Sequence, residues 1–156
     1  MSLFIATGSN LGDRKQQLDR AKLELSRIFE FIAESRIYES PAVDYLNQPD
    51  FYNQVLEFQL PKFSPSEVMS MLLKLEQNLG RNREVPKGPR IIDLDILFWG
   101  FDTVNLPHLT IPHPSLFERS FVVLPLSELP GFKDLNSRFS FNFSFNNTAS
   151  PISSLT

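Results

Sequence analysis

Two aspartates, Asp93 and Asp95, are the side chains best placed to do chemistry in this 156-residue sequence. They interrupt a run of β-branched and large apolar residues, 91–98, whose composition is typical of a buried strand. Successive side chains of a strand point to opposite faces, so we expect both aspartates on one face. That face would also carry Ile91 and Leu97, and the other would carry Ile92, Leu94, Ile96 and Phe98.

The spacing of the two carboxylates predicts a site for a divalent cation. Residues i and i+2 of a strand lie roughly 6–7 Å apart, so two carboxylates there repel each other and lose hydration. Mg²⁺ would remove both costs, because it usually binds one or two carboxylates and keeps positions for water and phosphate oxygens. Two solvated aspartates on an exposed face are the alternative, which the apolar character of this strand disfavours.

A basic segment, residues 81–90, runs directly into this strand. It holds Arg81, Arg83, Lys87 and Arg90 with prolines and glycine, and it lacks apolar periodicity. These features predict a loop that is mobile until a ligand orders it, although a merely solvated loop would have a similar composition. Arginine and lysine bind phosphate oxygens, so we expect the loop to close over a phosphate-bearing ligand.

Apolar spacing places the elements before this loop. We expect a strand at Leu3–Thr7, a turn at Gly8–Asp13, a helix with the stripe Leu18, Ala21, Leu25, Ile28 and Ile32, an extended segment at Phe31–Tyr38, a long loop at Glu39–Asp50 and a strand at Phe51–Leu60. The long loop suits ligand binding. Gly8 either permits a tight turn or lets the backbone approach a ligand.

A second helix has clear boundaries in the sequence. Ser64 can cap it, Pro65 fits its first position, Glu67 completes a capping box, and Gly80 can end it. Glu76 lies near the C-terminal end, where the helix dipole disfavours negative charge, so we expect a cationic or donor partner there.

The residues after the aspartate strand are expected to form a hairpin arm at Thr103–Leu106 and a helix at Ser115–Leu124, closed by Pro125. His108 and His113 lie between prolines in residues 107–114, and Arg119 lies on the expected helix. From Gly131 to Thr156 the sequence becomes a Phe/Ser/Asn-rich tail, expected to be an edge strand or disordered, with no recognisable chemistry.

Composition excludes several classes of protein. The net charge of -3 and pI of about 5.4 argue against a nucleic-acid binder. Cysteine is absent, so there is no disulfide framework and no thiolate metal site. No basic leader or membrane-length apolar run is present, which predicts a cytoplasmic or equivalent reducing location without a membrane partner.

Several segments together resemble the 6-hydroxymethyl-7,8-dihydropterin pyrophosphokinase family of folate biosynthesis. The most specific are residues 88–97, Gly-Pro-Arg-Ile-Ile-Asp-Leu-Asp-Ile-Leu, and residues 111–122, from Ile-Pro-His-Pro to Glu-Arg-Ser-Phe-Val. Residues 8–12, Ser40-Pro41, Phe51-Tyr52-Asn53, Glu76 and Gly80-Arg81 resemble the family in the same order. The resemblance implies a diphosphotransferase (kinase) domain over residues 1–130, followed by an irregular tail over 131–156.

The resemblance also implies a fold and a reaction. The fold would be α+β, a ferredoxin-like three-layer sandwich with a mainly antiparallel sheet and helices on its faces. The reaction would transfer pyrophosphate from ATP to the pterin hydroxymethyl group, giving AMP. Asp93 and Asp95 would hold two Mg²⁺ ions, and Asp93 could also orient or deprotonate the pterin hydroxyl.

The resemblance assigns further residues by position. Catalytic roles would fall to Asp93, Asp95, Arg81 and Arg90. Residues near the nucleotide would be Glu76, Arg81, Arg83, Lys87, Arg90, Ile96, Thr110, His113 and Arg119. The pterin pocket would be lined by Gly8, Ser40, Pro41, Val43, Phe51, Asn53, Asp93 and Phe121. Phe121 and Phe51 suit stacking on a flat pterin, and Asn53 suits its amide and amino edge.

Two departures and two alternatives bear on this interpretation. Lys87 stands where many relatives have an aromatic residue, and the tail replaces a usual helical region. Some relatives are fused to the next folate enzyme, which the sequence also allows here. A polymerase- or cyclase-like palm would carry carboxylates on a similar sheet, and an RNA-binding ferredoxin-like module would be the non-enzyme alternative, which the acidic pI disfavours.

Overall fold

The computed structural model describes residues 1–42, 47–81 and 89–152. In chain order the elements are β1 (Ser2–Ser9), α1 (Arg14–Ile28), β2 (Phe31–Glu34), β3 (Tyr38–Ser40), β4 (Phe51–Gln59), α2 (Pro65–Asn78), β5 (Asp93–Trp99), β6 (Val104–Leu106), β7 (Leu109–Ile111), the 3-10 helix η1 (Pro114–Glu118), α3 (Ser120–Leu126), α4 (Phe132–Arg138) and β8 (Ser150–Pro151). None of the described helices is long and apolar enough to cross a membrane.

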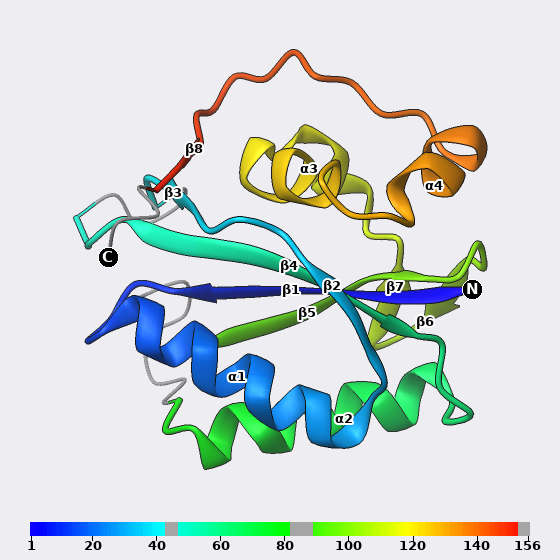
Figure 1. The fold of residues 1–156 in the computed structure, drawn as a ribbon, viewed down its shortest axis with the longest axis horizontal. Coiled ribbons are helices and arrows are strands. Elements are labelled where there is room, and N and C mark those ends of the chain that lie inside the picture. Colours follow the sequence, from blue (N-terminus) through cyan, green and yellow to red (C-terminus); the bar gives the residue numbers. More distant parts are fainter. Residues whose placement is uncertain (43–46, 82–88, 153–156) are drawn as a thin grey trace.

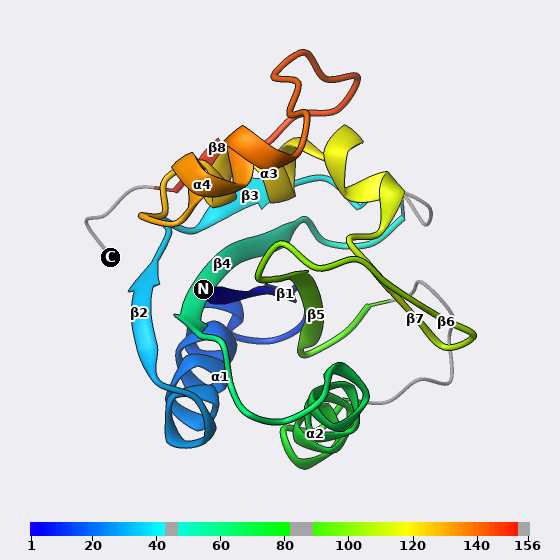
Figure 2. The ribbon, with the colours of Figure 1, turned by 90° about the vertical axis from the view of Figure 1, so that its right-hand side faces the viewer.

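The main sheet has the strand order β5-β1-β4-β3-β8, and β2 also pairs with β4. Every pairing between described strands is antiparallel, and β6 with β7 forms a separate hairpin. Helices α1 and α2 lie below the sheet in Figure 1, and α3 and α4 lie above it. Figure 2 shows the same three layers from the end of the curved sheet. The predicted α+β sandwich with an antiparallel sheet is confirmed.

The alternation of side chains along the strands builds one core on each face of the sheet. Leu3 and Ile5 of β1 pack in the cluster that includes Leu18 of α1 and Leu72 of α2. Phe4 packs in the opposite cluster, with Leu126 and Leu135 of the upper helices. Full burial of such side chains contributes about 1.5–3 kcal/mol each, so the two cores fix the helices on their faces.

A β-bulge in β5 changes which residues face which core. Ile5 of β1 pairs with Ile96, but Phe4 pairs with Phe98, so Leu97 is one residue too many for a regular ladder. Leu97 and Phe98 consequently both pack in the upper cluster, while Ile96 packs in the lower one. The prediction that Phe98 shares a face with Ile96 is therefore wrong. The two aspartates precede the bulge and stay on one side.

The helix boundaries agree with the sequence in one case and differ in three. For α2, the reciprocal capping box of Ser64 and Glu67 is present and Gly80 follows the helix at φ +100°, as predicted. Helix α1 ends at Ile28, so Ile32 lies on β2. The predicted single helix at 115–124 is wrong, because Arg119 is extended between η1 and α3. Helix α4 was not predicted, since its residues were assigned to the irregular tail.

Candidate active site

A cavity of about 490 Å³ opens where β1, β4 and β5 meet the hairpin β6–β7 and the start of α3. Most of the predicted site residues that the structure describes line it: Gly8, Ser40, Pro41, Phe51, Asn53, Arg90, Asp93, Asp95, Ile96, Thr110, His113, Arg119 and Phe121. The segments that carry them are far apart in the sequence, and the antiparallel sheet brings them together. Gly8 lies on β1 rather than in a turn, and of the two glycines in the predicted turn it is Gly12 that has a positive φ, +74°.

Three of the predicted residues cannot be placed. Val43 lies in residues 43–46, and Arg83 and Lys87 lie in residues 82–88, all outside the described part of the chain. The expected closure of the loop 81–90 is left as a prediction for the same reason. Only its flanks, Arg81 and residues 89–90, are described.

Behind the cavity wall, Arg81 joins two carboxylates. Its Nη1 donates to Oε2 of Glu76 at 2.8 Å and to Oδ1 of Asp93 at 2.8 Å. Oε2 of Glu76 also accepts the backbone N–H of Leu94 at 2.8 Å. The predicted cationic and donor partners of Glu76 are therefore present. Because Glu76 is buried on α2 and Leu94 is on β5, this carboxylate fixes the aspartate strand against the helix.

The two aspartates differ in how far the protein neutralises them. Asp93 accepts a hydrogen bond from Arg81 on Oδ1 and one from Arg90 Nη1 on Oδ2, the latter at 3.3 Å. Asp95 keeps solvent contact inside the concave cavity, but protein atoms crowd it. This loss of hydration, with repulsion from Asp93 and Glu76, raises the pKa of Asp95 to about 7. The guanidinium groups of Arg119 and Arg81 act in the opposite direction and are too weak to prevent the rise.

Two neighbouring carboxylates, of which Asp93 is paired with arginines while the charged form of Asp95 is disfavoured, are suited to a hard cation. Among residues 1–42, 47–81 and 89–152, no group of three or more histidine, aspartate or glutamate side chains is placed to hold a metal ion. Mg²⁺ needs fewer protein ligands than that when a bound phosphate supplies others, so Asp93 and Asp95 fit this ion. The placement of both carboxylates in the wall of one cavity supports the fit, and the raised pKa of Asp95 agrees with it.

The opposite side of the cavity carries an amide and aromatic rings. Asn53 Nδ2 donates to Oγ of Ser40 at 2.8 Å and to the carbonyl of Tyr38 at 3.4 Å, so β3 orients this side chain. The guanidinium carbon of Arg90 lies over the Phe51 ring, 5.3 Å from the ring centroid. This side can therefore bind a flat, polar-edged ring, while the aspartate side can bind charged groups.

The hairpin and η1 complete the cavity with polar groups. His113 caps η1, and its Nδ1 accepts the backbone N–H of Ser115 at 3.2 Å. His108 also lines the cavity, although no site role was predicted for it. Sequence reasoning further missed Thr7, Gln48, Gln54, Met69 and Ser115 as lining residues. For His108 the signal was available, since it lies two residues before Thr110 in the same short hairpin.

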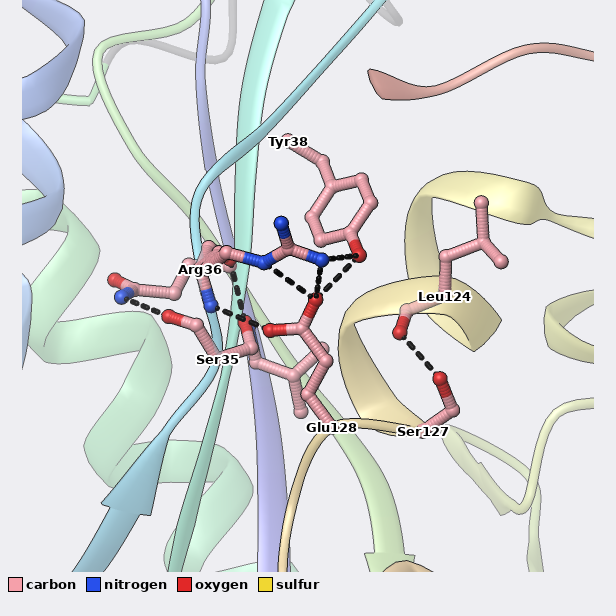
Figure 3. Close-up of polar contacts among 8 residues, drawn as sticks. Ser35, Arg36, Tyr38, Leu124, Ser127 and Glu128 are labelled. Carbon is pink, nitrogen blue, oxygen red and sulfur yellow. Dashed lines mark hydrogen bonds and ion pairs between the residues drawn. The ribbon is translucent and has the colours of Figure 1, made fainter. Parts of the chain in front are cut away.

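Figure 3 shows a second polar cluster, whose residues Arg36, Tyr38 and Glu128 do not line the cavity. Glu128, just after α3, accepts hydrogen bonds from the backbone N–H of Arg36 at 2.8 Å, from its Nε at 3.0 Å and from the hydroxyl of Tyr38. Burial alone would raise the pKa of Glu128, but the bonds from Tyr38 and Arg36 outweigh it and lower the pKa. This cluster ties the segment before β3 to the end of α3.

Comparison with known proteins agrees with this geometry. The sequence model of the 7,8-dihydro-6-hydroxymethylpterin-pyrophosphokinase (HPPK) family matches residues 4–131. The chain belongs to this family. It is 38% identical over 128 residues to the 2-amino-4-hydroxy-6-hydroxymethyldihydropteridine pyrophosphokinase of Bacillus subtilis, covering 81% of this chain and 76% of that protein. The family predicted from the sequence motifs is thus confirmed.

Other relatives are longer proteins. The chain is 40% identical over 131 residues to the folic acid synthesis protein fol1 of Pneumocystis carinii, covering 83% of this chain but only 18% of that protein. A Plasmodium falciparum HPPK-DHPS structure matches with a TM-score of 0.61 at 14% identity, over 81% of this chain and 38% of that one. At this identity the likeness shows the fold, and it confirms the predicted ferredoxin-like sandwich.

Proposed function

We propose that this chain transfers pyrophosphate from ATP to the hydroxymethyl group of 6-hydroxymethyl-7,8-dihydropterin, giving the pterin diphosphate and AMP, in folate biosynthesis. The observation that carries the proposal is one cavity with two chemically different sides in a member of the HPPK family. Carboxylates and arginines occupy one side, and an oriented amide with aromatic rings occupies the other. The reaction needs both sides at once, because the acceptor and donor must meet in line.

Asp93 and Asp95 would hold the Mg²⁺ ions of the reaction, for which we propose two. The chemistry that Mg²⁺ would supply there is neutralisation of charge on the phosphate oxygens. The protein contribution is an electrostatic one: Arg81 and Arg90 hold the Asp93 carboxylate in place through 2.8 and 3.3 Å contacts. Asp93 would also orient the pterin hydroxyl or accept its proton.

The remaining cations would bind the triphosphate. Arg90, His113 and Arg119 line the cavity beside the aspartates, where ATP phosphates would lie. Glu76, Ile96 and Thr110 would lie near the nucleotide, and Arg81, Arg83 and Lys87 would close over it. Contacts made only after closure favour the transition state over the bound substrates, so the loop cations would act mainly on the rate of transfer.

The pterin would bind against Asn53. The Asn53 side-chain N–H groups are directed to Ser40 and to the carbonyl of Tyr38. Oδ1 of Asn53 would therefore accept a hydrogen bond from the amino edge of the pterin ring. Phe51 and Phe121 would stack on the ring faces, with Gly8, Pro41 and Val43 completing the pocket. Asp93 would face the hydroxymethyl group from the other side of the cavity.

The test is direct: incubate the protein with ATP, Mg²⁺ and 6-hydroxymethyl-7,8-dihydropterin and measure AMP and pterin diphosphate. We expect AMP only when the pterin is present. AMP-free turnover to a cyclic nucleotide or a polymer, independent of pterin, would instead indicate a palm-type enzyme. Absence of any nucleotide turnover by folded protein would contradict the proposal.

We further propose a cytoplasmic or equivalent reducing location, supported by the absence of cysteine. Fusion to, or association with, other folate enzymes is a second proposal. It is supported by relatives named as bifunctional, such as the folate synthesis protein of Pisum sativum, of which this chain covers 25%.

A further inference from the structure

The segment after α4 lies outside the part of the chain that the family model matches, residues 4–131. In Figure 1 it runs across the top of α3 from α4 to the far end of the sheet. Phe139 and Phe141 pack against Phe98, with ring centroids 5.1 and 6.0 Å apart. Its last strand, β8, pairs with β3, the strand that carries Ser40. The segment is thus anchored at both ends and passes close to the cavity.

Between these anchors, the side chain of Asn147 forms hydrogen bonds with the residues on both sides of Arg119. We call this set of contacts the Asn147 grip. Its Oδ1 accepts the backbone N–H of Ser120 at 2.8 Å and the Ser120 hydroxyl at 2.6 Å. Its Nδ2 donates to the backbone carbonyl of Glu118 at 2.8 Å. One amide therefore satisfies a donor and an acceptor from the two residues that flank Arg119.

The contacts of Asn147 act at the junction of two helices, on the two residues that flank Arg119. Arg119 itself is held by both helices, because its N–H donates to the carbonyl of Leu116 at 3.1 Å and its carbonyl accepts from the N–H groups of Val122 and Val123 at 3.0 Å each. Its backbone is extended, φ -103° and ψ 108°, between the end of η1 and the start of α3. As N-cap of α3 it makes no side-chain cap hydrogen bond within the described structure. Ser120 is buried, so its N–H would lose a partner if Asn147 were absent, a costly state for a buried donor.

Two side chains next to the residues that Asn147 contacts, Arg119 and Phe121, belong to the active site. Arg119 and Phe121 both line the cavity, with the Arg119 guanidinium 6.0 Å from the Phe121 ring centroid. Arg119 interacts electrostatically with Asp95, on the side proposed for phosphate, and Phe121 is proposed to stack on the pterin. The direction of the backbone at residues 118–120 consequently sets the placement of one group for each substrate.

We propose that Asn147 is a positioning residue of this active site: it fixes the backbone around Arg119 so that Arg119 and Phe121 face the cavity. The catalytic meaning of the inference rests on the proposed function, whereas the grip itself does not. The tail, residues 131–156, in which the sequence shows no recognisable chemistry, would thereby help to position active-site residues.

The structural half is tested by amide hydrogen exchange at Ser120 in Asn147→Ala, with Asn146→Ala as the matched control. Asn146 is the exposed neighbour of the same residue type. We expect the Ser120 amide to exchange about tenfold faster in Asn147→Ala, as for a lost buried hydrogen bond. In the Asn146→Ala control the exchange rate should equal that of the wild type. Asn147→Asp keeps the acceptor, so it should retain part of the protection. Equal exchange in all the proteins would overturn the inference.

The functional half uses kcat/KM for both substrates at a temperature where every variant is folded by circular dichroism. We expect Asn147→Ala to lose about 10- to 100-fold in kcat/KM while Asn146→Ala is unchanged, since small misplacements of substrate-contacting groups are costly. A lowered melting temperature with unchanged kcat/KM would mean a merely structural anchor and would overturn the positioning role. If wild type and control both lack turnover, the proposed function fails, and the exchange result still decides whether the grip exists.

Discussion

Two carboxylate clusters of this protein have opposite electrostatic character. Around Asp95 in the cavity, the carboxylates of Asp93 and Glu76 add to loss of hydration, and the pKa is raised to about 7. Around Glu128, the hydroxyl of Tyr38 and the N–H groups of Arg36 more than compensate burial, and the pKa is lowered (Figure 3). Both clusters lie on the α3 side of the sheet, and each joins elements far apart in the sequence.

Of the two carboxylates, Glu128 is compensated by partners within the fold and Asp95 is not. Glu128 has its partners in the fold, so its charge stabilises the connection between β3 and α3. Ionisation of Asp95 is unfavourable in the protein alone, and the proposed cation would relieve this cost in stability. The comparison predicts that changes at Asp95 affect activity, whereas changes at Glu128 affect stability.

Asp95→Ala should abolish most of the activity. Removing one of two carboxylates that would hold Mg²⁺ should lower kcat/KM by about a thousandfold or more while the fold survives. Pterin-dependent AMP formation is the measurement, and Asp102→Ala, at an exposed aspartate just after the same strand, is the control. Near-normal turnover in Asp95→Ala would remove the distinction between the two clusters.

Asn53 lies between the clusters, because it contacts both Ser40 in the cavity and the carbonyl of Tyr38. Asn53→Ala and Phe121→Ala should each weaken pterin binding by about 30-fold, since a buried polar or stacking contact is lost, with little change in ATP binding. Calorimetry with each ligand separately measures this. Unchanged pterin affinity in both variants would mean that the pterin side of the cavity is wrongly assigned.

Glu128→Gln tests the complete cluster. The amide loses charge-assisted bonds to Arg36 and Tyr38, so the free energy of unfolding should fall by about 1–2 kcal/mol, a value kept modest because Arg36 is exposed. Urea unfolding measures the loss against Glu30→Gln, at an exposed glutamate. We expect kcat/KM to change less than about twofold; a larger fall would show that this cluster also supports the site.

The stability of the protein should depend on pH through Asp95. The folded-state pKa of Asp95 lies above its usual value of 3.8, so its contribution to stability is full below that pH and is lost as pH rises through 7. Asp95→Asn should therefore be more stable than wild type at pH 8 by about 1 kcal/mol, after allowance for solvent screening, and should lose this advantage near pH 4. Unfolding at both pH values, without Mg²⁺, measures it. An advantage that grows toward low pH would contradict the raised pKa.

Local signals in the sequence were sufficient where the physics is local. The Ser64–Glu67 capping box and Gly80 define α2, because they satisfy the backbone groups at the two ends of the same helix. The spacing of Asp93 and Asp95 was likewise sufficient to place both side chains on one face of the strand, because side chains alternate along a strand. The motifs around residues 88–97 and 111–122 were sufficient for the family, as the match over residues 4–131 confirms.

Tertiary structure decided whatever depends on partners distant in the chain. The bulge that turns Phe98 to the upper core arises from the register with β1, which no pattern within β5 encodes. Arg119 is extended because η1 and α3 meet there and Asn147, 27 residues from Ser120, supplies the hydrogen bonds that a continuous helix would have made. The raised pKa of Asp95 depends on Glu76 and on the walls of a cavity that exist only after folding. Helix α2, the aspartate pair and the family could be read from the sequence alone, because they follow from neighbouring residues. Folding alone decided which charges are compensated, because compensation depends on distance in space.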